Sequence, residues 1–302
     1  MSVPDYQSIM LPLLQCVADE QIHKFRELIE RLSKEFNLSE SDRRELLPSG
    51  KQALFDNRVG WANTYLKKAG LLQSEKRGFV QITELGLEVL NTNPEKINAA
   101  FLRQYDSFNQ FVGTNGKDSE ESNEQILETD NQTPKEKFEE SYQQITRLLI
   151  GQLSDQLAKI DPYKFEELVL DLLQAIGYGG NRSEAAQVTK KSADGGIDGI
   201  INEDRLGLDK IYIQAKRYNN TVPIKEVRDF AGAMLAHNAQ KGVFITTSDF
   251  PSSAKDFAEK IDRTLILIDG QRLAELMIEY NIGISPKETF VYKEIDSDYF
   301  ES

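Results

Sequence analysis

Hydrophobic periodicity divides the chain into two regions, each long enough to form a domain. In the second region, apolar residues recur at helical spacing over 161–177, and short apolar or alternating runs typical of strands follow. Strands are expected at 186–189, 197–201, 211–218, 242–247 and 264–268, and further helices near 222, at 254–261 and at 270–280. This order, α-β-β-β-α-β-α-β-α, predicts an α/β fold with a mixed sheet that is antiparallel where a hairpin lies.

The first region has the pattern of a winged helix-turn-helix domain. Helical spacing extends over 6–16 and 20–36, and Ser39 offers an N-cap for a shorter helix through Leu47. A longer helix, from about Leu54 to Ala69, is expected before two short strands within 71–82 and a last helix that starts at Thr83.

The composition changes between these regions. Residues 112–132 are mainly Gly, Asn, Ser, Asp and Glu, which predicts a flexible tether. Thr133, Pro134 and Glu136 then have the spacing of a capped helix start. This helix should run to about Ile160 and pack on the second domain or on another subunit. The predicted divisions are a winged-helix domain at 1–102, a flexible acidic linker at 103–132, the α/β domain at 133–286 and an acidic tail at 287–302.

The net charge of −13 argues against nucleic-acid binding unless the charge is unevenly distributed. Within 113–133 one lysine faces six acidic residues, and the segment from 287 is also acidic, so much of the negative charge lies in the linker and tail. Residues 54–80 are locally basic, with five basic residues against two acidic ones. These five are the predicted DNA contacts of the winged domain: Arg58, Lys67, Lys68, Lys76 and Arg77. A protein-interaction role for the winged domain is the alternative.

Other residue types limit the classes of site. Cys16 is the only cysteine and lies in an apolar segment, so no internal disulfide is expected. The two histidines, His23 and His237, are too few and too far apart in sequence for a zinc site. No apolar run is long enough to span a bilayer, and we expect a cytoplasmic protein with no membrane partner.

Candidate chemistry lies on two neighbouring strands. Alternation along 211–217 places Gln214 and Lys216 on one face, and Asp198 starts the preceding strand after two glycines. If these strands pair, the three side chains converge. A carboxylate, an amide oxygen and a lysine at one strand end suit a divalent cation beside a water that must lose a proton.

These residues resemble the PD-(D/E)xK nuclease superfamily, and within it the Mrr-type (type IV, methylation-dependent) restriction endonucleases. The resemblance rests on Phe165-Glu166, on Asp194 to Gly199 and on Gln214-Ala215-Lys216, and it extends from about Asp161 to Leu276. In the first domain, Arg58 to Ala62, Leu66 to Leu71 and Ile82 to Gly86 are also similar to the family. The implied fold is a winged domain followed by a mixed-sheet nuclease domain of the PD-(D/E)xK type.

The resemblance also implies a function. It implies a Mg²⁺-dependent endonuclease, with Mn²⁺ able to substitute, that cleaves foreign, methylated double-stranded DNA as a dimer or higher homo-oligomer. Asp198, Glu166 and Gln214 would hold the metal, Lys216 would act on the attacking water, and Arg217 would contact the DNA backbone. Gln214 stands where most superfamily members have an acid, which leaves a second metal ion in doubt. Asp194 is expected to be structural, and Lys190, Lys191 and Tyr218 are weaker candidates for backbone contacts.

Two alternatives stay open. A DNA repair or junction-processing nuclease would share the same core, and a winged-helix DNA-binding regulator could carry an inactive nuclease-like domain. Helical geometry separates two adjacent acids: Glu166 falls at the edge of the apolar stripe centred near Phe165, and Glu167 falls nearly opposite it. Glu166 is therefore expected to reach Asp198, and Glu167 is not.

Overall fold

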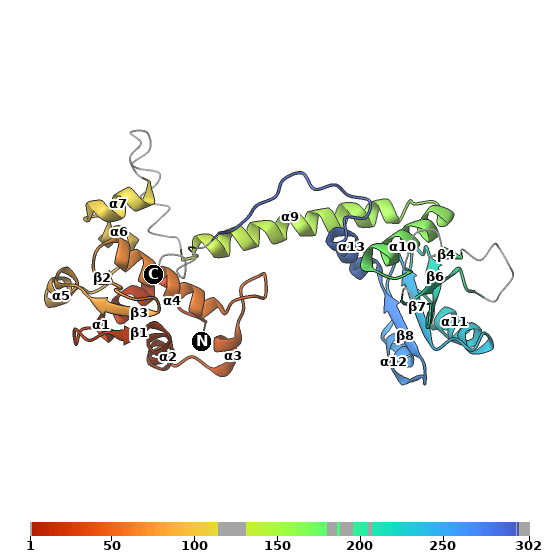
Figure 1. Ribbon diagram of the computed structural model, residues 1–302, viewed down its shortest axis with the longest axis horizontal. Coiled ribbons are helices and arrows are strands. Elements are labelled where there is room, and N and C mark those ends of the chain that lie inside the picture. The colour runs from red at the N-terminus through yellow and green to blue at the C-terminus, as the bar shows by residue number, and fades with distance from the viewer. Residues whose placement is uncertain are drawn as a thin grey trace. The chain divides into compact units, whose positions relative to one another are not determined.

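The computed structural model describes residues 2–113, 131–179, 186–187, 196–204, 207–293 and 295 (Figure 1). They form two compact units, one extending to Gln144 and the other running from Ile145 to Lys293. Each unit has a hydrophobic core of its own.

The first unit is mainly helical and carries a small sheet. Its elements are α1 (Tyr6–Cys16), β1 (His23–Lys24), α2 (Phe25–Glu35), α3 (Glu40–Arg44), α4 (Leu54–Lys68), β2 (Leu72–Gln73), β3 (Phe79–Ile82), α5 (Glu84–Asn91), α6 (Ala99–Leu102) and α7 (Asp106–Val112). The predicted order of helices, hairpin and helix is present. The prediction of one helix over 20–36 is wrong at its start, because His23 and Lys24 pair with Val80 and Phe79 as an edge strand. The resulting antiparallel sheet has the order β1-β3-β2.

The fold of the first unit continues beyond residue 102, where the linker was expected to begin. Phe108 of α7 is fully buried, and its ring packs edge-on against Tyr65 of α4 with 5.3 Å between centroids. Residues 103–113 are therefore part of this unit. The rest of the expected flexible linker, residues 114–130, lies outside the described residues, as does most of the acidic tail.

Helix α9 (Pro134–Leu157) is divided between the two units: its residues up to Gln144 belong to the first unit, and those from Ile145 belong to the second. Its start has the predicted capping box: Thr133 Oγ1 accepts from the Glu136 N–H at 3.2 Å, and Glu136 Oε1 accepts from the Thr133 N–H at 3.3 Å. Leu153 and Leu157, near its other end, are buried in the core of the second unit. The predicted domain boundary at residue 133 therefore differs from the structure, in which the first turns of α9 pack on the first unit.

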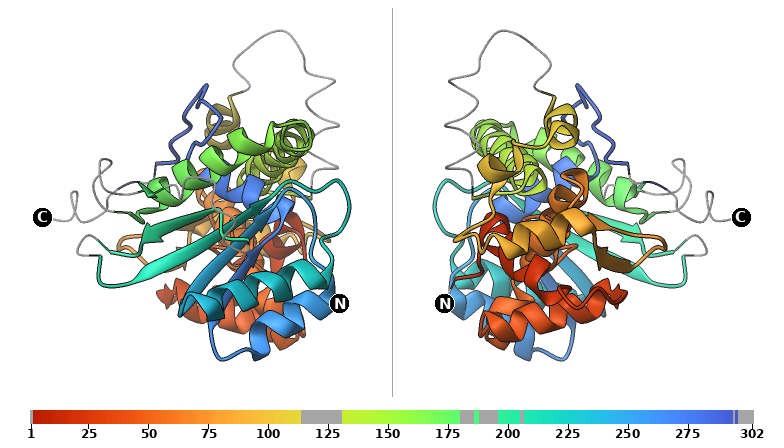
Figure 2. Two further views of the ribbon diagram at one scale, coloured as in Figure 1. Left: turned by 90° about the vertical axis from the view of Figure 1, so that its right-hand side faces the viewer. Right: turned by 90° about the vertical axis from the view of Figure 1, so that its left-hand side faces the viewer.

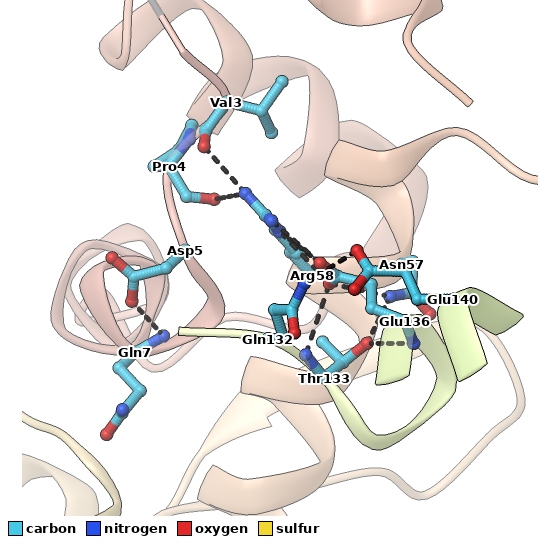
Figure 3. A network of polar contacts seen from close by, with 10 residues as sticks. All are labelled: Val3, Pro4, Asp5, Gln7, Asn57, Arg58, Gln132, Thr133, Glu136 and Glu140. Atoms are coloured by element: carbon cyan, nitrogen blue, oxygen red, sulfur yellow. Dashed lines mark hydrogen bonds and ion pairs between the residues drawn. The ribbon is translucent and has the colours of Figure 1, made fainter. Parts of the chain in front are cut away.

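A buried polar network fixes the start of α9 to α4 (Figure 3). The Arg58 guanidinium donates to the carbonyls of Val3 and Pro4 at 2.8 and 3.2 Å and forms an ion pair with Glu136 at 2.8 Å. Asn57 Nδ2 donates to Thr133 Oγ1 at 2.7 Å. Glu136 is nearly inaccessible to solvent, so its charge depends on these partners.

The second unit is a five-stranded mixed sheet with helices on both faces (Figure 2). After α9 come α10 (Pro162–Ile176), β4 (Ala186–Gln187), β5 (Gly199–Asn202), β6 (Lys210–Lys216), α11 (Ile224–Ala236), β7 (Lys241–Thr246), α12 (Ser252–Lys260), β8 (Thr264–Ile268) and α13 (Gly270–Glu279). The strands lie in the order β4-β5-β6-β7-β8. β4, β5 and β6 pair antiparallel, and β6, β7 and β8 pair parallel, which confirms the predicted order and the antiparallel hairpin.

The two faces of this sheet have separate cores. Ile211, Ile213 and Ala215 of β6 pack with α10, α13 and the end of α9, whereas Tyr212 belongs to the core under α11 and α12. Helix α10 starts at Asp161, whose side chain accepts from the N–H groups of Tyr163 and Lys164. Phe165 is fully buried at the first turns of α10, which fixes the helix against the sheet near the start of β5.

We predict that Glu136→Gln destabilises the first unit by about 3 kcal/mol, because Arg58 then keeps a buried positive charge without its carboxylate. Urea unfolding followed by the fluorescence of Trp61, the single tryptophan and a residue of α4, measures this change. The matched control is Glu140→Gln on an exposed position of the same helix, where a change within about 0.5 kcal/mol is expected. Equal effects of the two substitutions would contradict the role given to the network.

Candidate active site

Asp198 lies where β5 begins and holds the end of the β5–β6 ladder together. Its N–H donates to the Ile213 carbonyl at 2.8 Å, and its Oδ2 accepts from the Ala215 N–H at 2.8 Å. The regular pairing of the two strands starts one residue later, at Gly199 and Ile213. The carboxylate thus continues the ladder as an acceptor. Burial raises the pKa of the Asp198 carboxyl, and the hydrogen bond from Ala215 and the Lys216 charge only partly offset this effect.

Gln214 is buried beside Asp198, but its orientation differs from the predicted one. Its Nε2 donates to Asp198 Oδ2, so the amide nitrogen rather than the carbonyl oxygen faces the carboxylate. Its Oε1 faces Gly196, where a Cβ would come within 2.9 Å and where φ is +102°. In this arrangement Gln214 is a hydrogen-bond donor to the candidate metal ligand. It becomes an oxygen ligand only if its amide turns over.

Lys216 lies at the end of β6 on the same face of the sheet as Gln214, since side chains alternate along a strand. Its Nζ is 3.5 Å from Glu226 Oε2, in the first turn of α11. Both side chains are partly exposed. Sequence reasoning missed Glu226, because nothing in the spacing of the helix that follows β6 marks one of its acids as a partner of Lys216.

Glu166 and Asp198 line one cavity of about 160 Å³ on the α10 side of the sheet. The other lining residues are Tyr163, Glu167, Leu170, Gly199, Ile213 and Ala215. Glu166 is partly buried and Glu167 is exposed, which agrees with the predicted rotation of the helix. Glu167 nevertheless borders the cavity, contrary to the expectation that it faces away. Tyr163 is a further lining residue that the sequence pattern did not indicate.

The donor atoms at this site fit a hard divalent cation. No group of three His, Cys, Asp or Glu side chains that could hold a metal occurs among the described residues. Mg²⁺ does not require such a cage, because it keeps several waters and commonly binds one or two carboxylates. Asp198 and Glu166 supply two carboxylates to the cavity. Burial disfavours the charged form of Asp198, and a bound cation would favour it.

The five basic residues predicted to contact DNA in the first unit differ from one another in exposure and in their partners. The prediction is wrong for Arg58, because its guanidinium is mostly covered and is engaged in the ion pair with Glu136. Lys67 is partly buried, and burial lowers its pKa. Lys68 is exposed, with its Nζ 5.3 Å from the centroid of the Phe111 ring, and Lys76 and Arg77 are exposed in the turn between β2 and β3.

The remaining candidates lie in or near the second unit. Arg217 is exposed and donates to the Ala158 carbonyl at 3.1 Å. Tyr218 is partly buried beneath the end of the sheet, where its backbone exchanges hydrogen bonds with Thr247 Oγ1. Lys190, Lys191 and Asp194 lie outside the described residues.

Comparison with known proteins identifies the family. Residues 6–92 match the Mrr N-terminal domain, and residues 157–277 match the Mrr catalytic domain, described as a restriction endonuclease. The chain is 35% identical over 311 residues to the type IV methyl-directed restriction enzyme EcoKMrr of Escherichia coli strain K12, and the match covers 100% of both chains. The chain belongs to the Mrr family of restriction endonucleases. The predicted resemblance is confirmed, and this Mrr-family chain is a nuclease that acts on DNA.

Two solved structures are also similar. The DNA modification-dependent restriction endonuclease AspBHI is 22% identical with a TM-score of 0.37, covering 46% of this chain and 36% of its own. The MspJI restriction endonuclease in complex with a 27-mer oligonucleotide is 16% identical with a TM-score of 0.29, covering 68% of this chain and 49% of its own. Among the described residues, no helix is both long and apolar enough to cross a membrane.

We predict that Asp198→Asn raises the thermal stability of the second unit at neutral pH in the absence of divalent ions. A pKa that is raised in the folded state means that ionisation at neutral pH opposes folding. The gain should shrink as the pH falls from the raised pKa of the folded state toward the ordinary carboxyl value of about 4, and vanish below it, where aspartate is protonated in both states.

Calorimetry of both proteins between pH 3 and 7 measures this difference. The transition of the second unit is the one to which Trp61 fluorescence does not respond, because Trp61 lies in the first unit. An equal stability of the two proteins at every pH would contradict the electrostatic cost assigned to Asp198.

Proposed function

We propose that this Mrr-family nuclease is a Mg²⁺-dependent endonuclease that hydrolyses phosphodiester bonds of methylated, foreign DNA in the cytoplasm. The observation that carries the proposal is the meeting of two carboxylates, Asp198 and Glu166, in one cavity, with the charge of Lys216 close enough to act on Asp198. The methylated substrate is taken from the E. coli relative, whose name describes it as methyl-directed.

Asp198 and Glu166 are the residues that would hold the metal. When bound, a divalent cation lowers the pKa of a coordinated water and neutralises charge on a phosphate oxygen. Asp198 is held in position by the Ala215 N–H, which would favour its use as a ligand. Nucleases of the PD-(D/E)xK superfamily generally use a divalent metal, and Mg²⁺, with Mn²⁺ as a substitute, is the ion proposed here.

Lys216 would orient the attacking water and stabilise negative charge that develops at the phosphorus. Glu226 keeps the ammonium group near the strand end through the 3.5 Å ion pair. Gln214 would hold Asp198 in place by donating to its carboxylate. This role replaces the direct metal ligation expected from the sequence and is consistent with a single tightly held cation.

The first unit would bind the DNA duplex. Its helices and hairpin are consistent with a winged helix, and Lys68, Lys76 and Arg77 are the exposed members of the predicted set of phosphate contacts. Arg217 would add a backbone contact near the catalytic site. Assembly into a dimer or higher homo-oligomer would place two active sites on the two strands.

Two other functions use the same residues differently. A repair or junction-processing nuclease would keep the metal site but would cleave branched or damaged DNA regardless of methylation. A DNA-binding regulator would bind without cleaving, which the presence of Asp198, Glu166 and Lys216 in the second unit disfavours. Digestion of matched methylated and unmethylated plasmids, with and without Mg²⁺, separates the three functions.

We predict that Asp198→Ala and Lys216→Ala each lower the cleavage rate by about 10²-fold or more, because each removes a group acting at the reacting phosphate. DNA binding should stay within about twofold of the wild type, since neither residue belongs to the proposed binding surface. Plasmid digestion and electrophoretic mobility shifts measure the two properties. Full Mg²⁺-dependent cleavage by Asp198→Ala would overturn the metal assignment.

The two adjacent glutamates give a sharper test, because both line the cavity with Asp198. We predict that Glu166→Gln lowers cleavage by about two orders of magnitude and raises the Mg²⁺ concentration needed for half-maximal activity. Glu167→Gln, at the more exposed position of the same turn, should be close to wild type. A Mg²⁺ titration of plasmid cleavage compares them, and the reverse order of activities would assign the ligand to Glu167.

A further inference from the structure

The small sheet of the first unit has an outward face with an unusual set of side chains. Along β3, Val80 and Ile82 are buried toward the helices, so Phe79 and Gln81 lie on the opposite, outer face. Lys24 pairs with Phe79 and Gln73 pairs with Gln81, which places these partners on the same face. An aromatic ring, two amides and a lysine thus share one side of a three-stranded sheet.

A cavity of about 270 Å³ opens at this face. It is lined by Ile22, Ser74, Glu75, Lys76, Phe79, Val80 and Gln81. Ile22 is 54% exposed, and a single exposed isoleucine on a protein surface needs no explanation. Here, however, Ile22 and Phe79 form the apolar part of a hollow whose other walls carry a carboxylate, an ammonium group and an amide.

Two of the polar side chains that line the cavity, Gln81 and Ser74, are held in place by hydrogen bonds. Gln81 Nε2 donates to the Glu20 carbonyl at 2.8 Å, and Gln81 Oε1 accepts from Gln73 Nε2 at 3.2 Å. Ser74 Oγ donates to the carbonyls of Lys76 and Phe79, which fixes the turn between β2 and β3. A preformed cavity of this kind is typical of a binding site for a specific group rather than of a loosely packed surface.

The size and chemistry of the cavity indicate its ligand. Sites for drug-sized molecules span about 300–1,000 Å³, so a hollow just below that range suits a smaller planar group such as one nucleobase. Unstacked bases bind by stacking on aromatic rings and by hydrogen bonds to their edges. Phe79 offers the ring, and the Glu75 carboxylate can accept from an exocyclic amino group. Ile22 offers apolar contact to a methyl group.

The charge around the cavity supports nucleic acid as the partner. Lys76 forms part of the wall, and the neighbouring Arg77 is exposed in the same turn. Cations next to a cavity that receives a base would attract the phosphates flanking that base. Glu75 is the single acid among the residues that line the cavity.

We propose that this cavity binds the methyl-bearing base of modified DNA after the base has left the helical stack, with Ile22 in contact with the methyl group and Phe79 stacked on the ring. This proposal rests on the proposed function, since it names the part of the chain that reads the methylated substrate. It assigns substrate selection to the outer face of the β1-β3-β2 sheet rather than to α4, whose Asn57 and Arg58 are buried against α9.

The test measures binding of the full-length protein, without divalent ions, to fluorescent duplexes that are identical except for one methyl group. One pair carries N6-methyladenine or adenine, and the other carries 5-methylcytosine or cytosine. A methyl group in an apolar pocket commonly gives about 10-fold or greater discrimination, which is the preference expected of the wild type for one of the pairs. Ile22→Ser should bring that ratio close to one while leaving affinity for the unmethylated duplex within about twofold.

Two further variants separate recognition of the base from attraction to the backbone. Phe79→Ala should weaken binding of the methylated duplex by about 10-fold through the lost stacking. Lys76→Ala should weaken both duplexes equally, keep the methyl preference and flatten the log-log salt dependence by about one unit. Thermal unfolding of each variant, followed by Trp61 fluorescence, verifies that the first unit is folded.

The outcomes distinguish this site from the proposed function. Folded Ile22→Ser and Phe79→Ala proteins with the wild-type methyl preference would overturn the cavity as the reading site. If wild-type digestion stayed methyl-dependent in that case, the proposed function would stand. Methyl-dependent digestion without methyl-dependent binding would also overturn the cavity alone. A wild type that neither binds nor digests methylated DNA preferentially would overturn both proposals.

Discussion

The candidate active site depends on one carboxylate that completes a β-ladder. Asp198 accepts from the Ala215 N–H at the point where β5 stops pairing with β6, and it lies between the two faces of the sheet. On one face it meets Glu166 of α10, and on the other it receives the Gln214 amide and the field of Lys216. Loss of this side chain would therefore change the strand end and the charge of the site together.

The residues on these strands could be predicted because their arrangement is local. Alternation placed Gln214 and Lys216 on one face, and the hairpin brought them to Asp198 only 16 and 18 positions away. Helical geometry likewise placed Glu166 at the edge of the buried stripe, where it reaches the cavity. The same reasoning predicted that Glu167 faces away from the site, but Glu167 also lines the cavity. The cavity therefore extends to side chains well away from the apolar stripe of the helix.

Contacts between elements whose relative placement no sequence pattern fixes could not be predicted in this way. Lys216 and Glu226 belong to different elements, and the Arg58–Glu136 pair joins residues 78 positions apart across the acidic stretch. The local excess of basic residues made Arg58 one of five predicted DNA contacts, but in the structure its guanidinium forms an ion pair with Glu136. The two-residue strand β1 was missed for the same reason, since its only signal is the partner strand β3, more than 50 residues later.

The division of helix α9 has a consequence for how the two units of different family members can be recombined. The acidic stretch between them looks like the natural place to join the front of one family member to the back of another. A junction there would separate Arg58 and Asn57 from the Glu136 and Thr133 of their own chain, leaving buried polar groups to be matched by a foreign helix. Functional chimeras should therefore be joined inside α9, beyond Gln144, so that each first unit keeps the first turns of the helix that follows it.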